Sequence, residues 1–325
     1  MGNGRKSDRL RVIYGDATLG VYGKSVSCIF SRQMGGLESL VADGREWLYR
    51  MPRPAFWRAL TDNDRGSGFH LRSGMWLAAD MFITCREIQV SIDGRTIPLP
   101  KAPYNNCYTS HEEAEKVSVL FIYETITVPA ARVHVTYEVG ADESIRITAR
   151  YLGKKGLPQL PVFGMRFIMP TKAVRYEYEG LSGETYPDRM AGAIPGVYRI
   201  DGLPVTKYLV PQDCNVHMGT KWLKVYRDKV LDLSCKKKEA FSLCFAADEE
   251  PFAFSCIPYT PEELENATHQ EELPPARRTV VSILGAVRGV GGIDSWGTDV
   301  EERYHISGEK DIFCSFSIHA GGENS

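Results

Sequence analysis

The clearest pattern of apolar and polar positions lies between residues 132 and 151. Apolar residues alternate with polar ones in both halves of this segment, and the turn sequence Gly140-Ala141-Asp142-Glu143 separates the halves. Alternation with a period of two places one face of a strand in a core and the other face in solvent. The segment therefore predicts an antiparallel hairpin.

Ten further runs have the length and apolar content of strands. Short connections rich in glycine and aspartate separate several of them, as at Gly35-Gly36 and Asp43-Gly44. Because no rhythm of alternating strands and helices is present, we predict an all-β fold, a large antiparallel sandwich. The ten runs are 11–14, 26–31, 37–41, 117–128, 163–169, 221–226, 240–245, 252–256, 279–288 and 311–319.

Helical signal is confined to two short segments. Thr260, Pro261 and Glu263 combine a capping hydroxyl, a proline at the first helical position and a capping carboxylate, which predicts a helix ending at about Asn266. A second helix is predicted over residues 73–82, where apolar residues recur at helical spacing. The residues on the apolar side of this second helix are Met75, Ala78, Ala79 and Phe82.

The chain length alone is compatible with one or two domains. It has 325 residues, and large all-β sandwiches can reach such a size as single units. No linker of low complexity and no internal repeat interrupts the strand pattern. We predict a polar N-terminal tail at residues 1–10 and a single domain at residues 11–320.

The charge of the chain excludes some classes of partner. It carries 39 basic and 41 acidic residues, without the basic stripe with which nucleic-acid-binding proteins contact phosphates. No apolar run approaches the roughly 18 residues of a membrane span. The N-terminus also lacks the apolar segment of a signal peptide. These features predict a cytoplasmic protein that binds neither nucleic acid nor a membrane.

The eight cysteines are scattered and form no C-x-x-C pair. Structural zinc sites usually have such closely spaced ligands. A cysteine inside a strand also acts as a small apolar side chain. We therefore expect free thiols, and neither a metal site nor a cofactor in this chain.

The segment from Val290 to Gly297 has the composition of a shaped loop. Its glycines allow backbone conformations with positive φ, and Trp296 offers a flat apolar face and one N–H donor, which suits the C–H face of a sugar. Trp296 could equally fold back onto the core, and the residues alone leave both interpretations open. The other residues of interest in the loop are Gly291, Gly292, Asp294, Ser295 and Gly297.

A second motif, at residues 54–66, places Asp62 and Asp64 on either side of Asn63. Two neighbouring carboxylates could hold a metal or act as an acid pair, but a calcium loop needs a longer ligand series and a distal glutamate. We predict a structured loop in which Arg58 and Arg65 pair with carboxylates. In it, Asp62 is expected to accept hydrogen bonds from backbone N–H groups.

A third motif, at residues 180–193, contains Glu184 and Asp188 close together in sequence. Glycosidases use two carboxyl groups of this kind. Asp188 could equally form an ion pair with Arg189, and Arg189 could bind a carboxylate across an interface because its guanidinium suits bidentate pairing. The spacing does not decide between these roles.

The remaining candidates for catalysis are weak. Ser255 and Cys256 have neither an adjacent base nor a strained nucleophile elbow. His111, His217 and His269 are isolated and lack the spacing of metal ligands. No motif derived from the residues alone therefore indicates a catalytic site.

Five motifs occur in order along nearly the whole chain: Phe56-Trp57-Arg58-Ala59 with Thr61-Asp62-Asn63-Asp64, Gly183-Glu184-Thr185-Tyr186-Pro187-Asp188-Arg189, Tyr208-Leu209-Val210-Pro211-Gln212, Pro258-Tyr259-Thr260-Pro261-Glu262-Glu263-Leu264, and Gly291-Gly292-Ile293-Asp294-Ser295-Trp296. Together they resemble the small chain of LacZ-type β-galactosidases from glycoside hydrolase family 2. Ile293 departs from the pattern, because relatives often carry another residue before the Asp-Ser-Trp core. A similar start at residues 12–16 leads us to expect a separately encoded subunit.

This resemblance implies a β-supersandwich of the galactose-mutarotase-like type. It also implies a large partner chain whose TIM barrel carries the catalytic glutamates and binds magnesium and sodium ions, so no catalytic acid is expected here. Trp296, with Asp294 and Ser295, is expected to contact a β-galactoside such as lactose. Residues of the motifs at 54–66 and 180–193 are expected to be structural. They are Trp57, Arg58, Asp62, Asn63, Asp64, Glu184, Tyr186, Asp188 and Arg189.

Two other functions fit the same fold. A free-standing sugar-binding or aldose-epimerase protein would need a histidine acid and a carboxylate base converging in a cleft, and the sequence indicates no such pair. A purely structural β-sandwich could instead support the large chain without contacting substrate. The position of Trp296 separates this last function from the predicted one.

Overall fold

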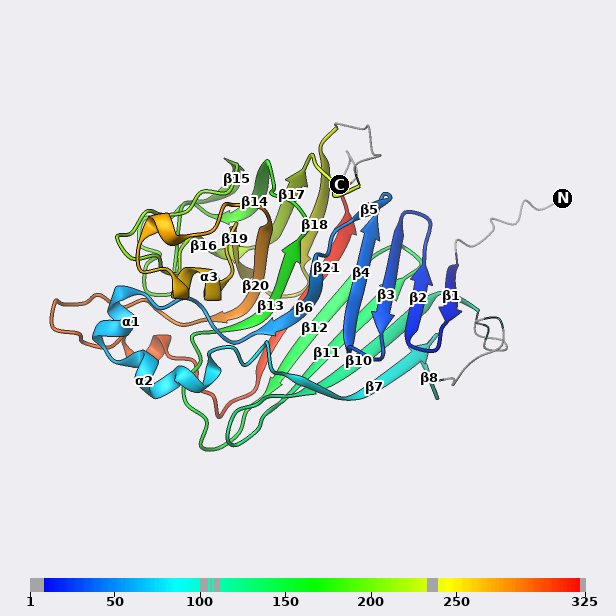
Figure 1. Ribbon diagram of the computed structural model, residues 1–325, viewed down its shortest axis with the longest axis horizontal. Helices are drawn as coiled ribbons and strands as arrows, with labels where there is room; N and C mark the ends of the chain where they lie inside the picture. The colour runs from blue at the N-terminus through cyan, green and yellow to red at the C-terminus, as the bar shows by residue number, and fades with distance from the viewer. Residues whose placement is uncertain (1–8, 100–104, 106, 108–111, 233–238, 322–325) are drawn as a thin grey trace.

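The computed structural model describes residues 9–99, 105, 107, 112–232 and 239–321. Within these ranges the strands pair antiparallel in three sheets (Figure 1). The six-stranded sheet contains β1 (Leu10–Tyr14), β2 (Thr18–Tyr22), β3 (Val26–Ser31), β4 (Gly36–Ala42), β5 (Arg45–Glu46) and β9 (Glu113–Ala114). The five-stranded sheet contains β6 (Arg50–Ala55), β13 (Val162–Met169), β16 (Val216–Thr220), β19 (Phe252–Ile257) and β20 (Thr279–Val287).

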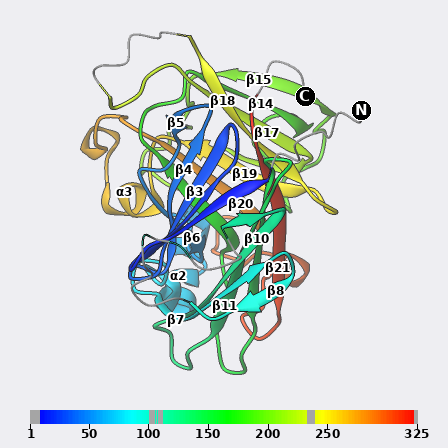
Figure 2. The same ribbon diagram turned by 90° about the vertical axis from the view of Figure 1, so that its right-hand side faces the viewer.

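The third sheet has ten strands in the order β15-β14-β17-β18-β21-β12-β11-β10-β7-β8. It extends across the whole molecule in Figure 1 and is seen from its β8 end in Figure 2. Its strands are β7 (Thr84–Ile92), β8 (Arg95–Ile97), β10 (Lys116–Glu124), β11 (Arg132–Gly140), β12 (Ile145–Leu152), β14 (Arg175–Leu181), β15 (Pro195–Asp201), β17 (Trp222–Arg227), β18 (Phe241–Ala247) and β21 (Ile312–Ala320).

The ten-stranded sheet forms one layer of a sandwich, and the two smaller sheets pack against it. Phe30 of β3 lies 5.6 Å from Tyr137 of β11 between ring centroids. Phe167 of β13 lies 5.3 Å from Phe245 of β18 and 6.0 Å from Phe316 of β21. These aromatic contacts belong to a buried core that draws apolar side chains from all three sheets. The predicted all-β sandwich is confirmed.

The predicted hairpin at 132–151 is confirmed as β11 and β12. Val133 pairs with Tyr151 and Tyr137 with Ile147, and all four side chains are buried. The other ten predicted runs also contain strands, although the run at 117–128 ends at Glu124 in β10. Period-two alternation therefore located the hairpin, and apolar runs located the other ten strands, some of which, such as β13 and β19, are buried on both faces.

Several strands lack that alternation and were not predicted. β6 contains Pro52 and Pro54 and lies at an edge of the five-stranded sheet, where a proline that cannot donate a hydrogen bond is tolerated. β15 is the outermost strand of the ten-stranded sheet, and none of its side chains is buried. Edge strands of this kind leave little hydrophobic signal in the sequence.

The two helix predictions have opposite outcomes. The helix at 260–266 is confirmed as α3 (Pro261–Asn266), with reciprocal capping hydrogen bonds between Thr260 and Glu263. The predicted helix at 73–82 is wrong, because a helix cannot continue through Ala78, whose φ is +57°. The remaining helical segments of the described chain are α1 (Asp62–Gly66), α2 (Phe69–Ser73) and the 3₁₀ turns η1 (Gly74–Trp76), η3 (Gln270–Glu272) and η4 (Glu302–Tyr304).

Some predictions concern residues outside the described ranges. Most of the predicted N-terminal tail, together with Cys235 and His111, lies there. The division into a tail and a single domain at 11–320 stays a prediction. Across the described residues, no helix has the length and apolar character needed to span a membrane.

Candidate functional site

Trp296 projects into solvent from the connection between β20 and β21. Its side chain is 92% exposed, whereas Trp47, Trp57 and Trp76 are buried. The connection extends from the sandwich beside α1, at the left of Figure 1. The alternative in which Trp296 folds back onto the core of its own chain is therefore wrong.

The tip of this loop is shaped by a carboxylate and by glycines. Asp294 accepts hydrogen bonds from the backbone N–H of Trp296 at 2.9 Å and from the hydroxyl of Thr298 at 2.5 Å. These donors lower the pKa of the Asp294 carboxyl, which keeps it ionised. Ser295 is exposed, and its hydroxyl makes no hydrogen bond to the described residues. Three glycines have positive φ: Gly291 (+69°), Gly292 (+77°) and Gly297 (+82°).

The first residues of the loop are held by side chains from distant motifs. The carboxylate of Asp188 accepts hydrogen bonds from the backbone N–H of Val290 at 2.9 Å and of Gly291 at 2.8 Å. Asn63 donates from its side-chain amide to the Val290 carbonyl at 3.0 Å, and Arg189 donates to the Gly291 carbonyl. The motifs at residues 54–66 and 180–193 therefore meet at the start of the Trp296 loop.

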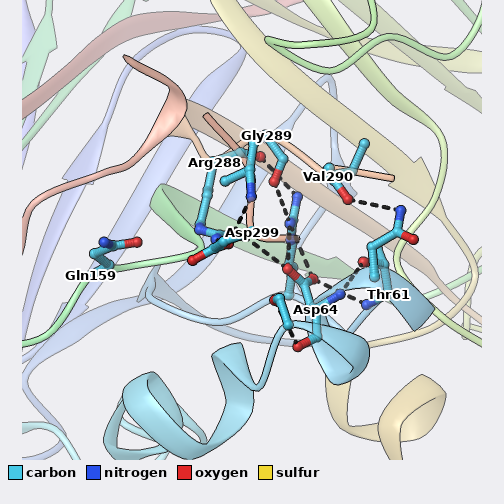
Figure 3. A network of polar contacts seen from close by, with 12 residues as sticks. Thr61, Asp64, Gln159, Arg288, Gly289, Val290 and Asp299 are labelled. Carbon is cyan, nitrogen blue, oxygen red and sulfur yellow. Dashed lines mark hydrogen bonds and ion pairs between the residues drawn. The ribbon is translucent and has the colours of Figure 1, made fainter. Parts of the chain in front are cut away.

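Beneath this contact lies a buried network of charges centred on Asp64 (Figure 3). Its carboxylate pairs with Arg58 at 3.2 Å and with Arg288 at 3.0 Å, and all three side chains are almost fully buried. Arg58 also donates to the carbonyls of Arg288 and Gly289, each at 3.0 Å. One carboxylate thus fixes two arginines and, through them, the backbone that enters the loop.

The end of the loop returns to the same network. Asp299 pairs with Arg288, and Arg72 of α2 donates to the other oxygen of Asp299 at 2.5 Å. The guanidinium of Arg288 lies 4.1 Å from the ring centroid of Phe69, also in α2. Both ends of the loop are consequently tied to one buried arginine, so the exposed tip has a rigid base.

The local sequence explains why Asp64 occupies the centre. Thr61 and Asp64 form a capping box at the start of α1, in which the Asp64 N–H donates to the Thr61 hydroxyl and the Thr61 N–H donates to the Asp64 carboxylate, both at 3.1 Å. We predicted that Asp62 would accept such bonds. The structure assigns them to Asp64, while Asp62 is exposed and pairs with Arg65 at 3.5 Å. The predicted loop is therefore the helical turn α1.

The pKa values of the two arginines in the network shift in opposite directions. Burial by itself would lower the pKa of Arg58, but Asp64 and Asp213 more than offset it, and the pKa lies above its usual value. Burial lowers the pKa of Arg288, with Asp64 and Asp299 opposing the shift. Two buried guanidinium groups that share Asp64 make its carboxylate an ion-pairing group and a poor metal ligand.

Glu184 and Asp188 do not act as a pair of free acids. Glu184 accepts hydrogen bonds from the backbone N–H of Asn215 and the hydroxyl of Thr206, both at 2.8 Å. Arg189 approaches Asp188 only at 3.9 Å. Both carboxylates are used to hold backbone or side-chain groups of neighbouring loops, which fits the structural role expected for this motif.

Tyr186 links the motif at residues 180–193 to the charge network around Asp64. Its hydroxyl donates to Asp213 at 2.9 Å, and the Arg58 guanidinium lies 5.7 Å from its ring centroid. Burial raises the pKa of Asp213 to about 6, although Arg58 and the Tyr186 hydroxyl both oppose the shift. Asp213 is thus protonated at a higher pH than an ordinary aspartate.

His217 and His269 do not form the acid–base pair that an epimerase would need. His217 is buried, with its ring centroid 4.6 Å from Tyr178 and 4.7 Å from Phe254, and its Nε2 contacts the Asn215 amide oxygen at 3.1 Å. His269 pairs with Glu272 at 3.1 Å on the exposed surface, where the carboxylate also caps a 3₁₀ turn. Neither histidine faces a carboxylate within a cleft.

The burial of His217 predicts a dependence of stability on pH. Burial lowers its pKa to about 4, whereas an unfolded histidine titrates near 6.5. Only the unfolded state gains a proton between these values, so the free energy of unfolding falls by up to about 3 kcal/mol as the pH is lowered from about 7 to 4.

The matched variant for this prediction is His217→Gln, which cannot titrate. Urea denaturation of both proteins at several pH values gives the difference between their free energies of unfolding. That difference should shrink as the pH falls through the window. If it stays constant from pH 7 to pH 4, His217 is not the responsible group.

The described cysteines have the character of structural residues. All seven are free, and burial raises the pKa of Cys256, which makes this thiol a poor nucleophile. Ser255, next to it, is buried in β19. Among the described residues, no cluster of histidine, cysteine, aspartate and glutamate is arranged to hold a metal ion.

Two important residues were not recognised in the sequence. Arg288 follows a run of buried strand residues, and Asp299 lies just beyond the Trp296 loop. A charged residue directly after the apolar run at 279–287 is the available signal for Arg288. Its partner Asp64 lies 224 residues away in sequence, so the pairing itself could not be read from local patterns.

Comparison with known proteins identifies the family of the chain. Residues 22–318 match the family model described as "Beta galactosidase small chain". A β-galactosidase small subunit from Latilactobacillus sakei is 59% identical over 310 residues, which cover 95% of this chain and 98% of that protein. A β-galactosidase from Halalkalibacterium halodurans is 34% identical over 317 residues, covering 95% of this chain but only 28% of that longer protein.

Solved structures give a more distant likeness. A galactose mutarotase-like protein from Lactobacillus casei aligns with 94% of this chain and 100% of its own, at 10% identity and a TM-score of 0.40.

Proposed function

The chain belongs to the β-galactosidase small-chain family, and we propose that it is the subunit that completes the active site of a large β-galactosidase chain. The substrates are terminal β-D-galactosides such as lactose. The large chain supplies the catalytic carboxyl groups, and this chain supplies the Trp296 loop. The isolated chain is expected to be inactive.

The proposed chemistry divides between the two chains. The large chain cleaves the glycosidic bond by the retaining route, in which one carboxylate forms a glycosyl-enzyme and a second carboxyl group acts as acid and then as base. The indole of Trp296 stacks on the C–H face of the sugar in the incoming or acceptor position and excludes water from the pocket. The exposed hydroxyl of Ser295 and the carboxylate of Asp294 lie beside it on the same loop.

One observation carries this proposal. Trp296 is 92% exposed, yet both ends of its loop are fixed by the buried pairs of Arg288 with Asp64 and Asp299. A rigid base under an exposed indole is the arrangement needed to present an aromatic platform to another surface, because ordering the loop then costs little entropy on binding.

Co-expression tests the proposal. This chain and the large β-galactosidase chain from the same genome are produced separately and together, and hydrolysis of a chromogenic galactoside is measured. Activity should require both chains. Hydrolysis by this chain alone, or equal activity of the large chain alone, would show that it does not complete the site.

The shape of the loop gives a second test. A Cβ atom at Gly297 would lie 2.6 Å from the carbonyl oxygen of Gly66 in α1, and the φ of +82° costs an alanine about 1–2 kcal/mol. Gly297→Ala is therefore expected to push the loop away from α1 and raise the KM of the two-chain enzyme several-fold, as measured by initial rates.

Gly44→Ala is the control for this variant. Gly44 has a φ of +70° but nothing within 4 Å of its Cβ position, so alanine there adds backbone strain without a collision. It should lose a similar amount of stability and leave KM unchanged. If both variants raise KM equally, the effect comes from stability and not from the position of the loop.

The compartment and the ions are part of the same proposal. We place the protein in the cytoplasm, which the seven free cysteines support because reducing compartments keep thiols reduced. Magnesium and sodium ions are assigned to the large chain.

A further inference from the structure

The segment after α1 exposes an unusual number of apolar side chains. Leu71 is 80% exposed, Met81 62% and Phe82 61%. Large apolar side chains that gather in one exposed patch, unlike those scattered singly, mark a surface for a protein partner. We call this set the apolar patch, and it consists of Leu71, Met75, Leu77, Met81 and Phe82.

The apolar patch does not result from a poorly packed core. Phe69, Trp76 and Ala79, which alternate with its members, are fully buried. Trp76 stacks on Phe56 at 5.6 Å between ring centroids and donates from its indole to the Pro158 carbonyl at 3.3 Å. The backbone of this segment is thus anchored by buried residues that alternate with the exposed apolar ones.

The apolar patch adjoins the Trp296 loop. Arg72, next to Leu71, pairs with Asp299 at the end of the loop at 2.5 Å. Phe69 packs under the Arg288 guanidinium, and the Cα of Gly297 lies 3.8 Å from the Cβ position of Gly66 in α1. α1, α2 and the loop lie together in Figure 1. The apolar patch and the indole therefore belong to one face of the molecule.

From this continuity we propose that the apolar patch is the docking surface for the large catalytic chain. The inference rests on the proposed function: if Trp296 enters the pocket of the large chain, that chain must cover the surface around the loop. The relative from Halalkalibacterium halodurans, of which this chain matches only 28%, carries a polypeptide more than twice the length of this chain outside the matched region. A partner of that size can cover α2 and the loop together.

Measurement of the affinity between the two purified chains tests the inference. The triple variant Leu71→Gln/Met81→Gln/Phe82→Gln replaces the three most exposed side chains of the apolar patch. Because each such side chain contributes about 1.5 kcal/mol or more when it is buried, the dissociation constant should rise at least roughly 1,000-fold. The single variant Leu71→Gln should raise it about 10-fold.

Leu231→Gln is the matched control. Leu231 is 63% exposed and lies in the connection between β17 and β18, two strands that Figure 1 shows apart from α2. The same substitution there should leave the dissociation constant within about twofold. Leu71→Met, which keeps an apolar side chain, should also bind normally, and urea denaturation shows whether each variant is folded.

Each outcome decides the inference. Normal binding by the folded single and triple variants overturns the docking surface, while activity that requires both chains still supports the proposed function. If the unaltered chain does not bind the large chain, both the docking surface and the proposed function are wrong. If the unaltered chain dimerises and the triple variant is monomeric with normal affinity for the large chain, the apolar patch joins two copies of this chain, and the inference is wrong.

Discussion

Replacing Asp64 with asparagine is expected to lower the free energy of unfolding by about 3–5 kcal/mol, because removal of one partner leaves buried charge uncompensated. Arg58 and Arg288 both depend on this carboxylate, and all three side chains are nearly inaccessible to solvent. Asparagine has almost the same volume, so the loss reports charge and not packing. Urea denaturation at neutral pH measures it.

Asp62→Asn is the control within the same helical turn. Asp62 is largely exposed and pairs with Arg65 only at 3.5 Å, and exposed pairs contribute about 0–1 kcal/mol. The free energy of unfolding should therefore change by less than about 1 kcal/mol in this variant. Equal losses at the two positions would contradict the central place of Asp64 in the network.

Replacing Trp296 with leucine is expected to raise the KM of the two-chain enzyme by roughly 2- to 12-fold or more, because an aromatic contact adds about 0.5–1.5 kcal/mol beyond the buried area. The value of kcat should change less, because a contact made equally with substrate and transition state affects KM alone. Trp296 is exposed, so the variant should keep its stability. Initial rates with a chromogenic galactoside measure both constants.

Trp296→Phe separates the aromatic face from the size of the indole. It keeps a flat apolar ring and should recover part of the affinity lost in Trp296→Leu. If KM is unchanged in both variants, the chain only supports the large chain, and the interpretation of Trp296 as a sugar platform is wrong.

The sequence predicted the strands that coincide with clear apolar runs and missed several others, including β14, in which every second side chain is buried. β11 and β12 alternate strictly and were found. β15 has no fully buried side chain, and β6 contains two prolines, so neither gives the clear signal of a half-buried strand. The limit is physical, since an edge strand is held by backbone hydrogen bonds that leave no signature in side-chain polarity.

The false helix at 73–82 has a related cause. Its apolar residues were placed on one side of a helix because of their spacing, yet Met75 and Phe82 are exposed. Apolar spacing indicates that side chains need burial, and it does not say whether the same chain buries them. If the apolar patch is the docking surface, its side chains are buried by the large chain and not by the core of their own chain.

The candidate site could be located from the sequence, but its construction could not. Glycines around Asp294 and Trp296 indicated a shaped loop, and the structure gives those glycines positive φ. The anchors Asp188 and Asn63 lie 102 and 227 residues from Val290. Contacts over such separations depend on how the sheets pack, which no local pattern records.

The most direct test of the account is the position of the Trp296 indole in a structure of the two-chain enzyme with a bound galactoside. The account predicts that the indole lies against the sugar within about 4 Å, the distance of van der Waals contact. An indole that faces solvent, or that packs on the large chain away from the sugar, would contradict it.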